Sequence, residues 1–353
     1  MAKTEGSKAS QPDIGTPSKF QRTVNYFKGI RIADGVIHVK TTGQQIPIDT
    51  KLLISVIAVL RMYLYLFGVK FFRWLRRATP TENIAFYPEQ PAFWYNIWID
   101  VQISGLRLCE NTDDADFVFV FDDTTKTDVD LTKVGSEKIL INHRITDVSK
   151  KTVGAVFEDV FGYPISIDPL TYKGRGIRKS DENGTHDGKV LEFPIREDQV
   201  MPHFAYQRLV ETINESGVCE EYRVAFVFGR IAVVYHKYKA VERRFGTEYL
   251  DVTLRSAEDV FSRAEVERLV TFCEQMGLDF GAIDVLRDKH SKRIYVVDVN
   301  KTCMPVLSLK FAVQMDAHRR ISMALLKGLD EKLSVRPSKT APAPSHTLAS
   351  ARG

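Results

Sequence analysis

Phe280–Arg287, FGAIDVLR, and Arg293–Asn300, RIYVVDVN, are two short apolar stretches that decide the fold of this chain. Both are rich in valine and isoleucine, and the polar segment Asp288–Lys292 separates them, so they predict an antiparallel hairpin. Alternate residues of a strand share a face. One face of this hairpin is apolar and is expected to pack on a core: Ile283, Val285, Tyr295, Val297 and Val299.

The other face of the hairpin carries polar residues. If residues 290–292 form the loop, Asp284 lies directly opposite Asp298, and Asn300 lies on the same face. Like charges that face each other destabilise a sheet, so this arrangement calls for a compensating cation. Carboxylate and amide oxygens suit Mg²⁺, which keeps several waters and binds substrate phosphates. The hairpin alone therefore predicts either a magnesium site for a nucleotide or a solvated sheet edge without a ligand.

Composition indicates a globular protein. The 353 residues are 44% hydrophobic, enough for a sizeable core and two or three subdomains. Lysine and arginine number 49 against 45 acidic residues, and the basic residues are scattered, so nucleic acid is not expected as a partner. The four cysteines lie far apart without a CxxC pair, which favours a reducing, cytoplasmic environment over a disulfide framework or a zinc site.

One apolar segment stands out near the N-terminus. Leu52–Val69 is almost unbroken in its hydrophobicity and precedes the basic aromatic cluster Lys70–Arg77, KFFRWLRR. Arg61 lies at its centre, where a charge costs about 2.5 to 3.5 kcal/mol in a spanning helix. Three alternatives stay open: a core helix, an interfacial helix whose basic cluster meets anionic headgroups, and a true span. The protein is expected to be cytoplasmic, or peripheral at the inner face of a membrane if the helix is interfacial.

The rest of the chain reads as mixed α and β structure between two tails, 1–19 and 331–353, that are expected to be disordered. Short apolar runs and helical periodicity define the elements. Strands are expected at Ile84–Tyr87, Asp116–Asp122, Ile139–Asn142, Ile165–Asp168, Gly176–Lys179, Lys189–Phe193 and Phe204–Val210, with a hairpin over Glu221–Lys239. Helices are expected at Ala92–Gly105, Asp147–Phe161 (introduced by Thr146 and Asp147), Arg263–Met276 (capped by Ser262) and Ala312–Leu329.

Arg178–Gly188 is a candidate phosphate-binding segment. It joins two short strands through a loop with two glycines, whose backbone N–H groups could lie against a phosphate while Lys179 supplies a positive charge. The segment does not match the Walker pattern, so a P-loop is excluded. Lys150 on the preceding helix is a second candidate. Taken alone, the loop also reads as an ordinary hairpin turn and Lys150 as a solvated helix lysine.

Taken together, the order of these segments resembles the ATP-grasp superfamily over about Asn142–Leu329. The features that carry the resemblance are the two lysines, the glycine loop and the closing Asp298-x-Asn300 pair. The resemblance implies an α+β fold with two antiparallel-sheet lobes and flanking helices, preceded by a small α/β subdomain. The expected boundaries are an N-terminal segment 20–80 that contains helix 52–77, the α/β subdomain 81–145, the small lobe 146–212 and the large lobe 213–330.

The resemblance also implies a role for each matching residue. Lys150 and Lys179 would contact the ATP phosphates beneath a flap formed by Asn183–Gly188. The cofactor-binding residues would be Lys150, Lys179, Asn183, Gly184, His186 and Gly188, with Gln207, Arg208, Leu209 and Val210 as the adenine-facing hinge. Arg223, with Lys179, would act in catalysis beside the transferred phosphoryl group. Asp284, Asp298 and Asn300 would hold Mg²⁺.

The implied activity is an ATP- and Mg²⁺-dependent ligase that activates a carboxylate as an acyl phosphate for attack by an amine or similar nucleophile. The alternatives are an ATP-dependent phosphotransferase and an inactive nucleotide-binding scaffold at a membrane. Two departures from the family pattern are visible. Lys301–Pro305 lacks the usual Pro-Gly turn, and Asp168-Pro169 stands where Lys-Pro is common, which leaves Lys173 or Lys179 as the phosphate lysine. Cys303, within the first of these segments, is expected to be a buried thiol. The sequence identifies neither substrate nor oligomeric state.

Overall fold

The computed structural model describes residues 30–39, 45–77, 82–246, 248–306 and 309–335. The chain forms two compact units, Met1–Leu64 and Tyr65–Gly353. In the first unit, β1 (Ile30–Ala33), β2 (Val36–Val39) and β3 (Gln45–Pro47) form an antiparallel sheet in that order. The sequence analysis did not predict these strands.

Helix α2 (Thr50–Leu75) covers the predicted apolar segment and crosses from the first unit into the second. It is long and apolar enough to cross a membrane by length and composition. Met62 and Leu66 are buried, at 4% exposed each, whereas most of its other apolar side chains are exposed. Among the described residues, the helix therefore lacks the burial that the core-helix alternative requires.

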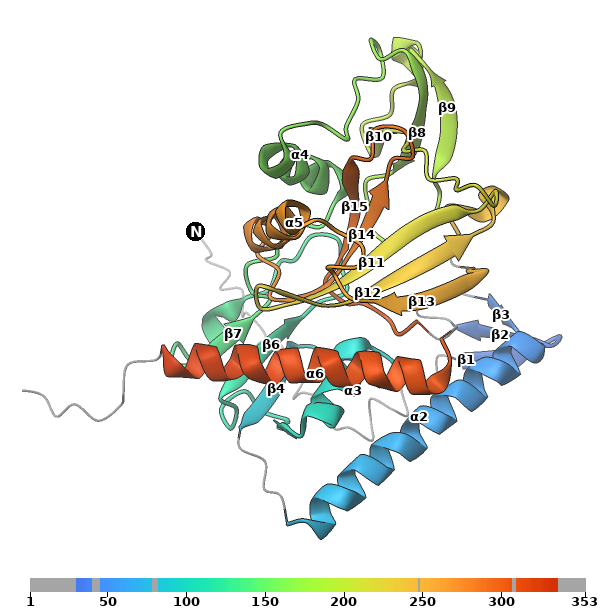
Figure 1. Ribbon diagram of the computed structural model, residues 1–353. Helices are drawn as coiled ribbons and strands as arrows, with labels where there is room; N and C mark the ends of the chain where they lie inside the picture. Colours follow the sequence, from blue (N-terminus) through green and yellow to red (C-terminus); the bar gives the residue numbers. More distant parts are fainter. Residues whose placement is uncertain (1–29, 40–44, 78–81, 247, 307–308, 336–353) are drawn as a thin grey trace, which may run out of the picture. The chain divides into compact units, whose positions relative to one another are not determined.

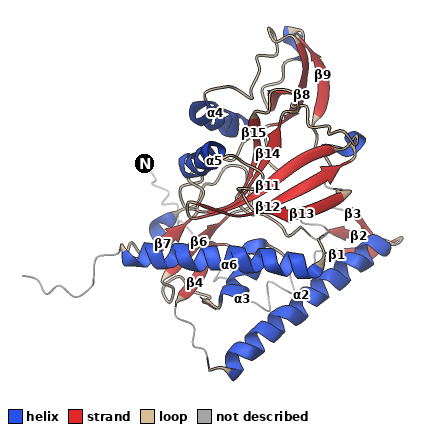
Figure 2. Ribbon diagram, in the orientation of Figure 1, coloured by secondary structure: helices blue, strands red, loops and turns tan. Residues whose placement is uncertain are grey.

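After the end of α2, the second unit contains a parallel sheet of order β5-β4-β6-β7. Figures 1 and 2 label β4, β6 and β7 of this sheet. Its strands are β4 (Asn83–Pro88), β5 (Arg107–Leu108), β6 (Phe117–Phe121) and β7 (Ile139–Ile141), and helix α3 (Asn96–Ser104) follows β4. All five residues of β6, FVFVF, are buried, as expected of a parallel strand covered on both faces. This sheet is the predicted α/β subdomain.

A second, antiparallel sheet has the order β10-β8-β9 and forms the small lobe. It consists of β8 (Gly174–Ser180), β9 (Lys189–Phe193) and β10 (Phe204–Arg208), and helix α4 (Lys150–Phe161) precedes it. The N-cap of α4 is Ser149, which accepts from the N–H of Thr152; the sequence analysis instead chose Thr146 and Asp147. The predicted strand Ile165–Asp168 is absent from the described structure, where Ser166 makes an isolated bridge to Gln207.

The large lobe is a five-stranded antiparallel sheet of order β13-β12-β11-β14-β15. Its strands are β11 (Cys219–Val227), β12 (Arg230–Lys239), β13 (Asp251–Arg255), β14 (Phe280–Arg287) and β15 (Ile294–Asn300). Helix α5 (Arg263–Gln275) begins at a capping box between Ser262 and Glu265, as its sequence predicts. Short 3₁₀ turns occupy Leu131–Lys133, Glu197–Gln199 and Val241–Arg243.

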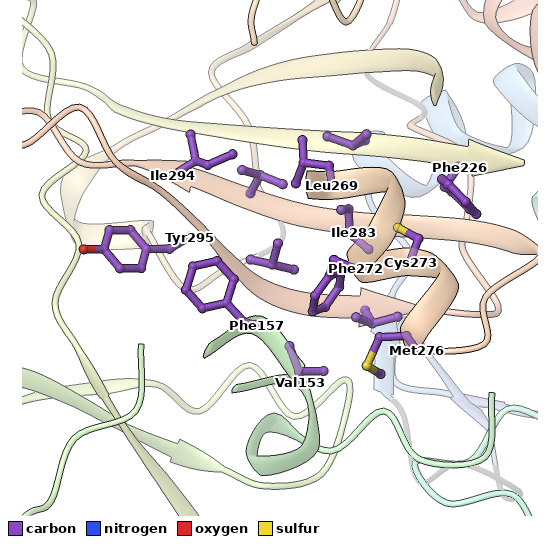
Figure 3. Packing of buried hydrophobic residues seen from close by; sticks show 14 of the residues in the cluster. Val153, Phe157, Phe226, Leu269, Phe272, Cys273, Met276, Ile283, Ile294 and Tyr295 are labelled. Atoms are coloured by element: carbon purple, nitrogen blue, oxygen red, sulfur yellow. The ribbon is translucent and has the colours of Figure 1, made fainter. Parts of the chain in front are cut away.

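The two faces of the large sheet pack against different helices. One face contributes Phe226, Ile283 and Tyr295 to a core that includes Phe157 of α4 and Leu269 of α5 (Figure 3). Part of the opposite face, with Ala225, Phe280 and Ala282, packs in a second core with the parallel sheet and α6 (Phe311–Ser334). Helix α6 extends past the predicted end at Leu329, into the region expected to be a tail. Val335 follows as an exposed residue, and residues 1–19 and 336–353 of the predicted tails lie outside the described ranges.

The predicted hairpin is present, with one irregularity. Asp284 pairs with Asp298, as predicted from the sequence, and Ala282 pairs with Asn300. The register then shifts by one residue between Asp284 and Val285, so Val285 pairs with Val296 and Val297 forms a bulge. The predicted architecture, two antiparallel lobes with flanking helices after a small α/β subdomain, is confirmed. The predicted domain boundaries stay predictions.

Asn142 joins the parallel sheet to the large lobe. It follows β7 in the left-handed region, at φ 58°, which asparagine tolerates better than most residues. Its side-chain Nδ2 donates to the backbone carbonyl of Phe280 at 2.7 Å. Its side-chain Oδ1 accepts from the backbone N–H groups of Asp279 and Phe280 at 2.9 and 2.8 Å. Asn142 is 3% exposed, so these bonds are shielded from water and fix the start of β14 against the end of β7.

Candidate nucleotide site

Charged side chains gather on the part of the large sheet that its helices leave open. Paired residues of neighbouring antiparallel strands point to the same face. Arg223 of β11 pairs with Asp284 of β14, which pairs with Asp298 of β15, and Glu221 of β11 pairs with Lys237 of β12. The same face that is apolar at Ala225 and Ala282 thus becomes charged toward the small lobe.

Asp284 is the centre of this charged region. Arg223 binds it through two parallel hydrogen bonds, Nε to Oδ1 at 2.9 Å and Nη2 to Oδ2 at 2.8 Å. Lys237 Nζ lies 3.3 Å from Oδ1, and Asn300 Nδ2 donates to Oδ2 at 3.3 Å. Burial would raise the pKa of Asp284, but Arg223 and Lys237 outweigh it and hold that pKa well below its usual range.

A second acid, Glu221, balances two lysines that the sequence analysis did not identify. Lys237 Nζ donates to Glu221 at 2.8 Å and Lys239 Nζ at 2.7 Å, and both ammonium groups lie over the ring of Tyr249, at 5.0 and 5.3 Å. Lys237 is completely buried, which a lysine tolerates only with such partners. The signal was present in the sequence, because Lys237 and Lys239 alternate with Tyr238 at the end of a strand that starts, after Arg230, with the apolar run Ile231–Val234.

The small lobe contributes Lys150. Its Nζ donates to Asp298 Oδ1 at 2.6 Å and to Asn183 Oδ1 at 2.9 Å, so the amine connects the first turn of α4 to β15 and to the predicted flap. Asn183 also donates to the carbonyl of Val299 at 3.3 Å. Lys150 is 5% exposed. The solvated-lysine alternative for this residue is wrong.

Lys179 lies on the face of the small sheet that looks toward β15. Its Nζ donates to the carbonyl of Val297 at 2.9 Å, and Val297 is the bulged residue of β15. Burial lowers the pKa of Lys179 to about 8, although the carboxylate of Asp298 acts in the opposite direction. Lys173 is exposed and precedes the start of β8. The geometry therefore favours Lys179 over Lys173 as the phosphate lysine.

The predicted flap is brought beside the site only in part. Asn183 contacts Lys150, and the N–H of Gly184 turns back to Asn183 Oδ1 at 3.1 Å. His186 and Gly184 are exposed, and both have positive φ, at 52° and 76°. Gly188 lies against the ring of Phe245, where a Cβ atom would come within 2.8 Å. Gly188 thus has a packing role that the sequence did not reveal.

The predicted hinge contains a buried polar group without a partner. Gln207 is 2% exposed, and its Nε2 has no hydrogen-bond partner among the described residues. Gln207 pairs with Ile177 of β8 and therefore points to the same face as Ile177. Lys179 lies two residues after Ile177, so its side chain is on this face too. Arg208 is engaged elsewhere, because it donates to the hydroxyl of Tyr295 at 2.8 Å. Strand β10 ends at Arg208, and Leu209 and Val210 continue toward the large lobe.

The oxygens of the predicted metal site differ in their availability. Both oxygens of Asp284 accept from Arg223. In Asp298, Lys150 donates to Oδ1 and not to Oδ2, and the side chain is 25% exposed. The described residues contain no cluster of three or more His, Cys, Asp or Glu side chains suited to a metal. The donor set thus fits an ion held by Asp298, Asn300 and phosphate oxygens, rather than an all-protein cage.

The turn after β15 is tied to the α/β subdomain. Cys303 is buried, its carbonyl accepts from the N–H of Asn96 at 3.0 Å, and its Sγ accepts from Asn96 Nδ2 at 3.4 Å. Burial raises the pKa of this thiol to about 11, which leaves it protonated at neutral pH. The expectation of a buried thiol is confirmed. Lys301, also buried, lies 3.6 Å from the carboxylate of Asp122.

Comparison with known proteins gives structural matches alone. No protein-family model matches the chain, and no curated protein matches its sequence. Among solved structures, the ATP-grasp ligase PsnB in complex with precursor peptide PsnA2 and AMPPNP is 12% identical, with a TM-score of 0.49 over 71% of this chain and 99% of that chain. In a PsnB complex with a minimal precursor, the match spans 64% of that chain and 54% of this one, at 14% identity and a TM-score of 0.37.

Two further matches come from named bacteria. The macrocyclase MdnC bound with precursor peptide MdnA, from Microcystis aeruginosa MRC, is 10% identical, with a TM-score of 0.41 over 70% of this chain and 99% of that chain. A RimK domain protein ATP-grasp from Sphaerobacter thermophilus DSM 20745 is 11% identical, with a TM-score of 0.43 over 69% of this chain and 99% of that chain. All four matches have sequence identities of 14% or less and TM-scores below 0.5.

Proposed function

We propose that this protein binds Mg-ATP between its two antiparallel lobes and uses it as a ligase that activates a carboxylate. One observation carries the proposal. Lysines from the small lobe and charged residues from the large sheet meet on one face, with five cationic side chains against three carboxylates. The cationic residues are Lys150, Lys179, Arg223, Lys237 and Lys239, and the acids are Glu221, Asp284 and Asp298. This surplus of positive charge suits a polyphosphate.

Each side chain then has a role that follows from its position. Lys150 and Lys179 would exchange their present contacts, Asp298 and the Val297 carbonyl, for phosphate oxygens. Gln207 would use its unpartnered Nε2 as a donor to the adenine base. Asp298 and Asn300 would hold Mg²⁺, and the ion would supply positive charge that offsets the charge of the phosphates.

Arg223 would act during phosphoryl transfer. A carboxylate oxygen of the substrate would attack the γ-phosphorus, and the bond to the β-γ bridging oxygen would break to release ADP. The guanidinium of Arg223 stabilises the charge that develops, while Asp284 holds it in position through two hydrogen bonds. An amine would then attack the acyl carbon, lose a proton and expel phosphate. Closure of the lobes would keep water from the acyl phosphate.

A carboxylate-to-amide substitution tests the nucleotide site. Asp298→Asn removes a charge from the proposed metal site, so calorimetry should find the affinity for Mg-ATP reduced by about tenfold or more in a chain that stays folded by circular dichroism. Asp198→Asn is the matched control, because this carboxylate is 69% exposed and pairs only with Arg196 among the described residues. An Asp298→Asn protein that binds Mg-ATP as tightly as the wild type would refute the metal assignment.

Hydroxylamine tests the chemistry. It converts an acyl phosphate to a stable hydroxamate, so a panel of carboxylic acids incubated with Mg-ATP and hydroxylamine should yield hydroxamate and ADP in equal amounts for the right substrate class. Transfer to a hydroxyl would release ADP and form a phosphate ester without hydroxamate, which would favour the phosphotransferase. Nucleotide binding without ADP release across the whole panel would favour the scaffold.

A further inference from the structure

Helix α2 carries a continuous apolar stripe whose side chains are exposed. In the second unit, Phe67, Phe71 and Trp74 are 71%, 46% and 72% exposed. In the first unit the stripe continues along the same side of the helix as Leu53, Ile57, Leu60 and Leu64, exposed by 46% to 64%. These residues are spaced alternately by four and three positions, which places them in one line on a helix.

The stripe is wider than a helix–helix seam. Val56 and Leu75 lie at its two margins and Phe72 extends it on one side; they are 54%, 60% and 60% exposed, in the order Val56, Leu75, Phe72. At about 100° per residue, the apolar arc covers close to half of the helix circumference. A two-helix coiled coil uses a narrow seam with charged residues beside it, so the breadth of this surface fits a lipid interface better than a single partner helix.

The charges of the helix point to an anionic partner. From Thr50 to Arg77 the chain contains no acidic residue but six basic ones: Lys51, Arg61, Lys70, Arg73, Arg76 and Arg77. Two copies of α2 packed together would bring like charges close to each other. Trp74 and the phenylalanines lie at the same end as Arg76 and Arg77, and this combination of aromatic and basic side chains suits the headgroup region of a bilayer.

The opposite side of α2 is fixed to the second unit. Arg73 Nη2 donates to the carbonyls of Ile103 and Ser104, at 2.6 and 2.8 Å, at the end of α3. Leu66 is 4% exposed, and the ring of Tyr65 lies edge-on to Phe311 at 6.1 Å. A helix held along one side by a folded unit cannot be surrounded by lipid. This attachment favours a helix that lies in the plane of the membrane surface over one that spans it.

We infer that α2 docks the protein on an anionic bilayer surface, with the stripe from Leu53 to Trp74 among the upper acyl chains and Arg76 and Arg77 at the headgroups. The cytoplasmic leaflet has this charge. The inference is independent of the nucleotide site, so either can fail alone.

Vesicle flotation with the full chain tests the inference. The wild type should float with vesicles of phosphatidylcholine and phosphatidylserine and bind vesicles of phosphatidylcholine alone more weakly, with an added loss in high salt. Phe71→Ser with Trp74→Ser should reduce the partition coefficient by about tenfold or more. Arg76→Glu with Arg77→Glu should reduce it by a similar factor on anionic vesicles only.

Met323→Ser is the matched control, because Met323 is an apolar residue of α6 that is 64% exposed. It should leave flotation unchanged, and all variants should keep the wild-type affinity for Mg-ATP and the wild-type circular dichroism. Sedimentation velocity provides the opposing outcome. A stable dimer that Phe71→Ser with Trp74→Ser dissociates, in a protein that does not float, would overturn the inference in favour of a second copy of the chain.

Discussion

Lys179 has a pKa that burial moves close to neutral pH. Because burial lowers its pKa to about 8, its amine should be charged near pH 7 and mostly neutral near pH 9. A phosphate ligand prefers the charged form, so affinity for Mg-ATP, measured by calorimetry, should fall by about tenfold between these two pH values. Lys179→Arg should bind almost equally at both, because a guanidinium stays charged. Parallel pH profiles for the two proteins would rule out Lys179 as the titrating group.

At this scale the sequence predicted part of the site. The facing of Asp284 and Asp298 followed from strand parity alone, and Lys150 and Lys179 followed from the resemblance. Lys237 and Glu221 were missed, because the long hairpin over Glu221–Lys239 was predicted without assigning its faces. Ion pairing depends on which strands become neighbours, and no local pattern reports that β11 lies between β12 and β14.

The turn from α5 into β14 depends on a glycine for two separate reasons. Gly277 has φ 75°, and a Cβ atom there would come within 2.7 Å of the backbone and side chain of Arg144. Gly277→Ala should therefore lower the free energy of unfolding by about 2 to 4 kcal/mol, from the positive φ and from overpacking together. Gly162, which ends α4 at φ 76° with nothing within 4 Å, is the control.

Gly162→Ala should cost only the conformational part, about 1 kcal/mol, in the same urea titration. Equal losses at the two sites would contradict the contact with Arg144.

Among the elements themselves, long periodic segments such as Arg263–Gln275 were predicted almost to the residue. The bulge at Val297 was not predictable, because the apolar pattern of the two strands is equally compatible with a regular antiparallel pairing that has no bulge.

The connection through Asn142 belongs to the whole second unit. Asn142→Ala would leave two N–H groups and one carbonyl at the start of β14 buried without partners. We expect a loss of about 3 to 5 kcal/mol in the free energy of unfolding, measured by urea titration, while the folded fraction keeps its affinity for Mg-ATP. Asn83→Ala, which removes one partly buried side-chain bond to Asp116, should cost only about 1 kcal/mol. A similar small loss at Asn142 would mean that the two sheets are held together by apolar packing alone.

The order of the sheets in this unit was predictable, because α/β and antiparallel segments differ in composition. The exposure of α2 was not predictable, since an apolar helix reads the same whether protein or lipid covers it. The contact that fixes one side of α2 joins Arg73 to the end of α3, which lies about thirty positions further along the chain.

The buried ion pairs that connect Arg223, Asp284, Lys237 and Glu221 also limit which substitutions this protein can accept during evolution. Arg223, Asp284 and Glu221 each neutralise a partner that water does not reach, and removing one member of such a set costs about 3 to 5 kcal/mol. A lineage cannot lose these residues one at a time without passing through a poorly folded ancestor. Homologues should therefore keep the set intact or replace it as a group, so that its members are inherited together across three strands.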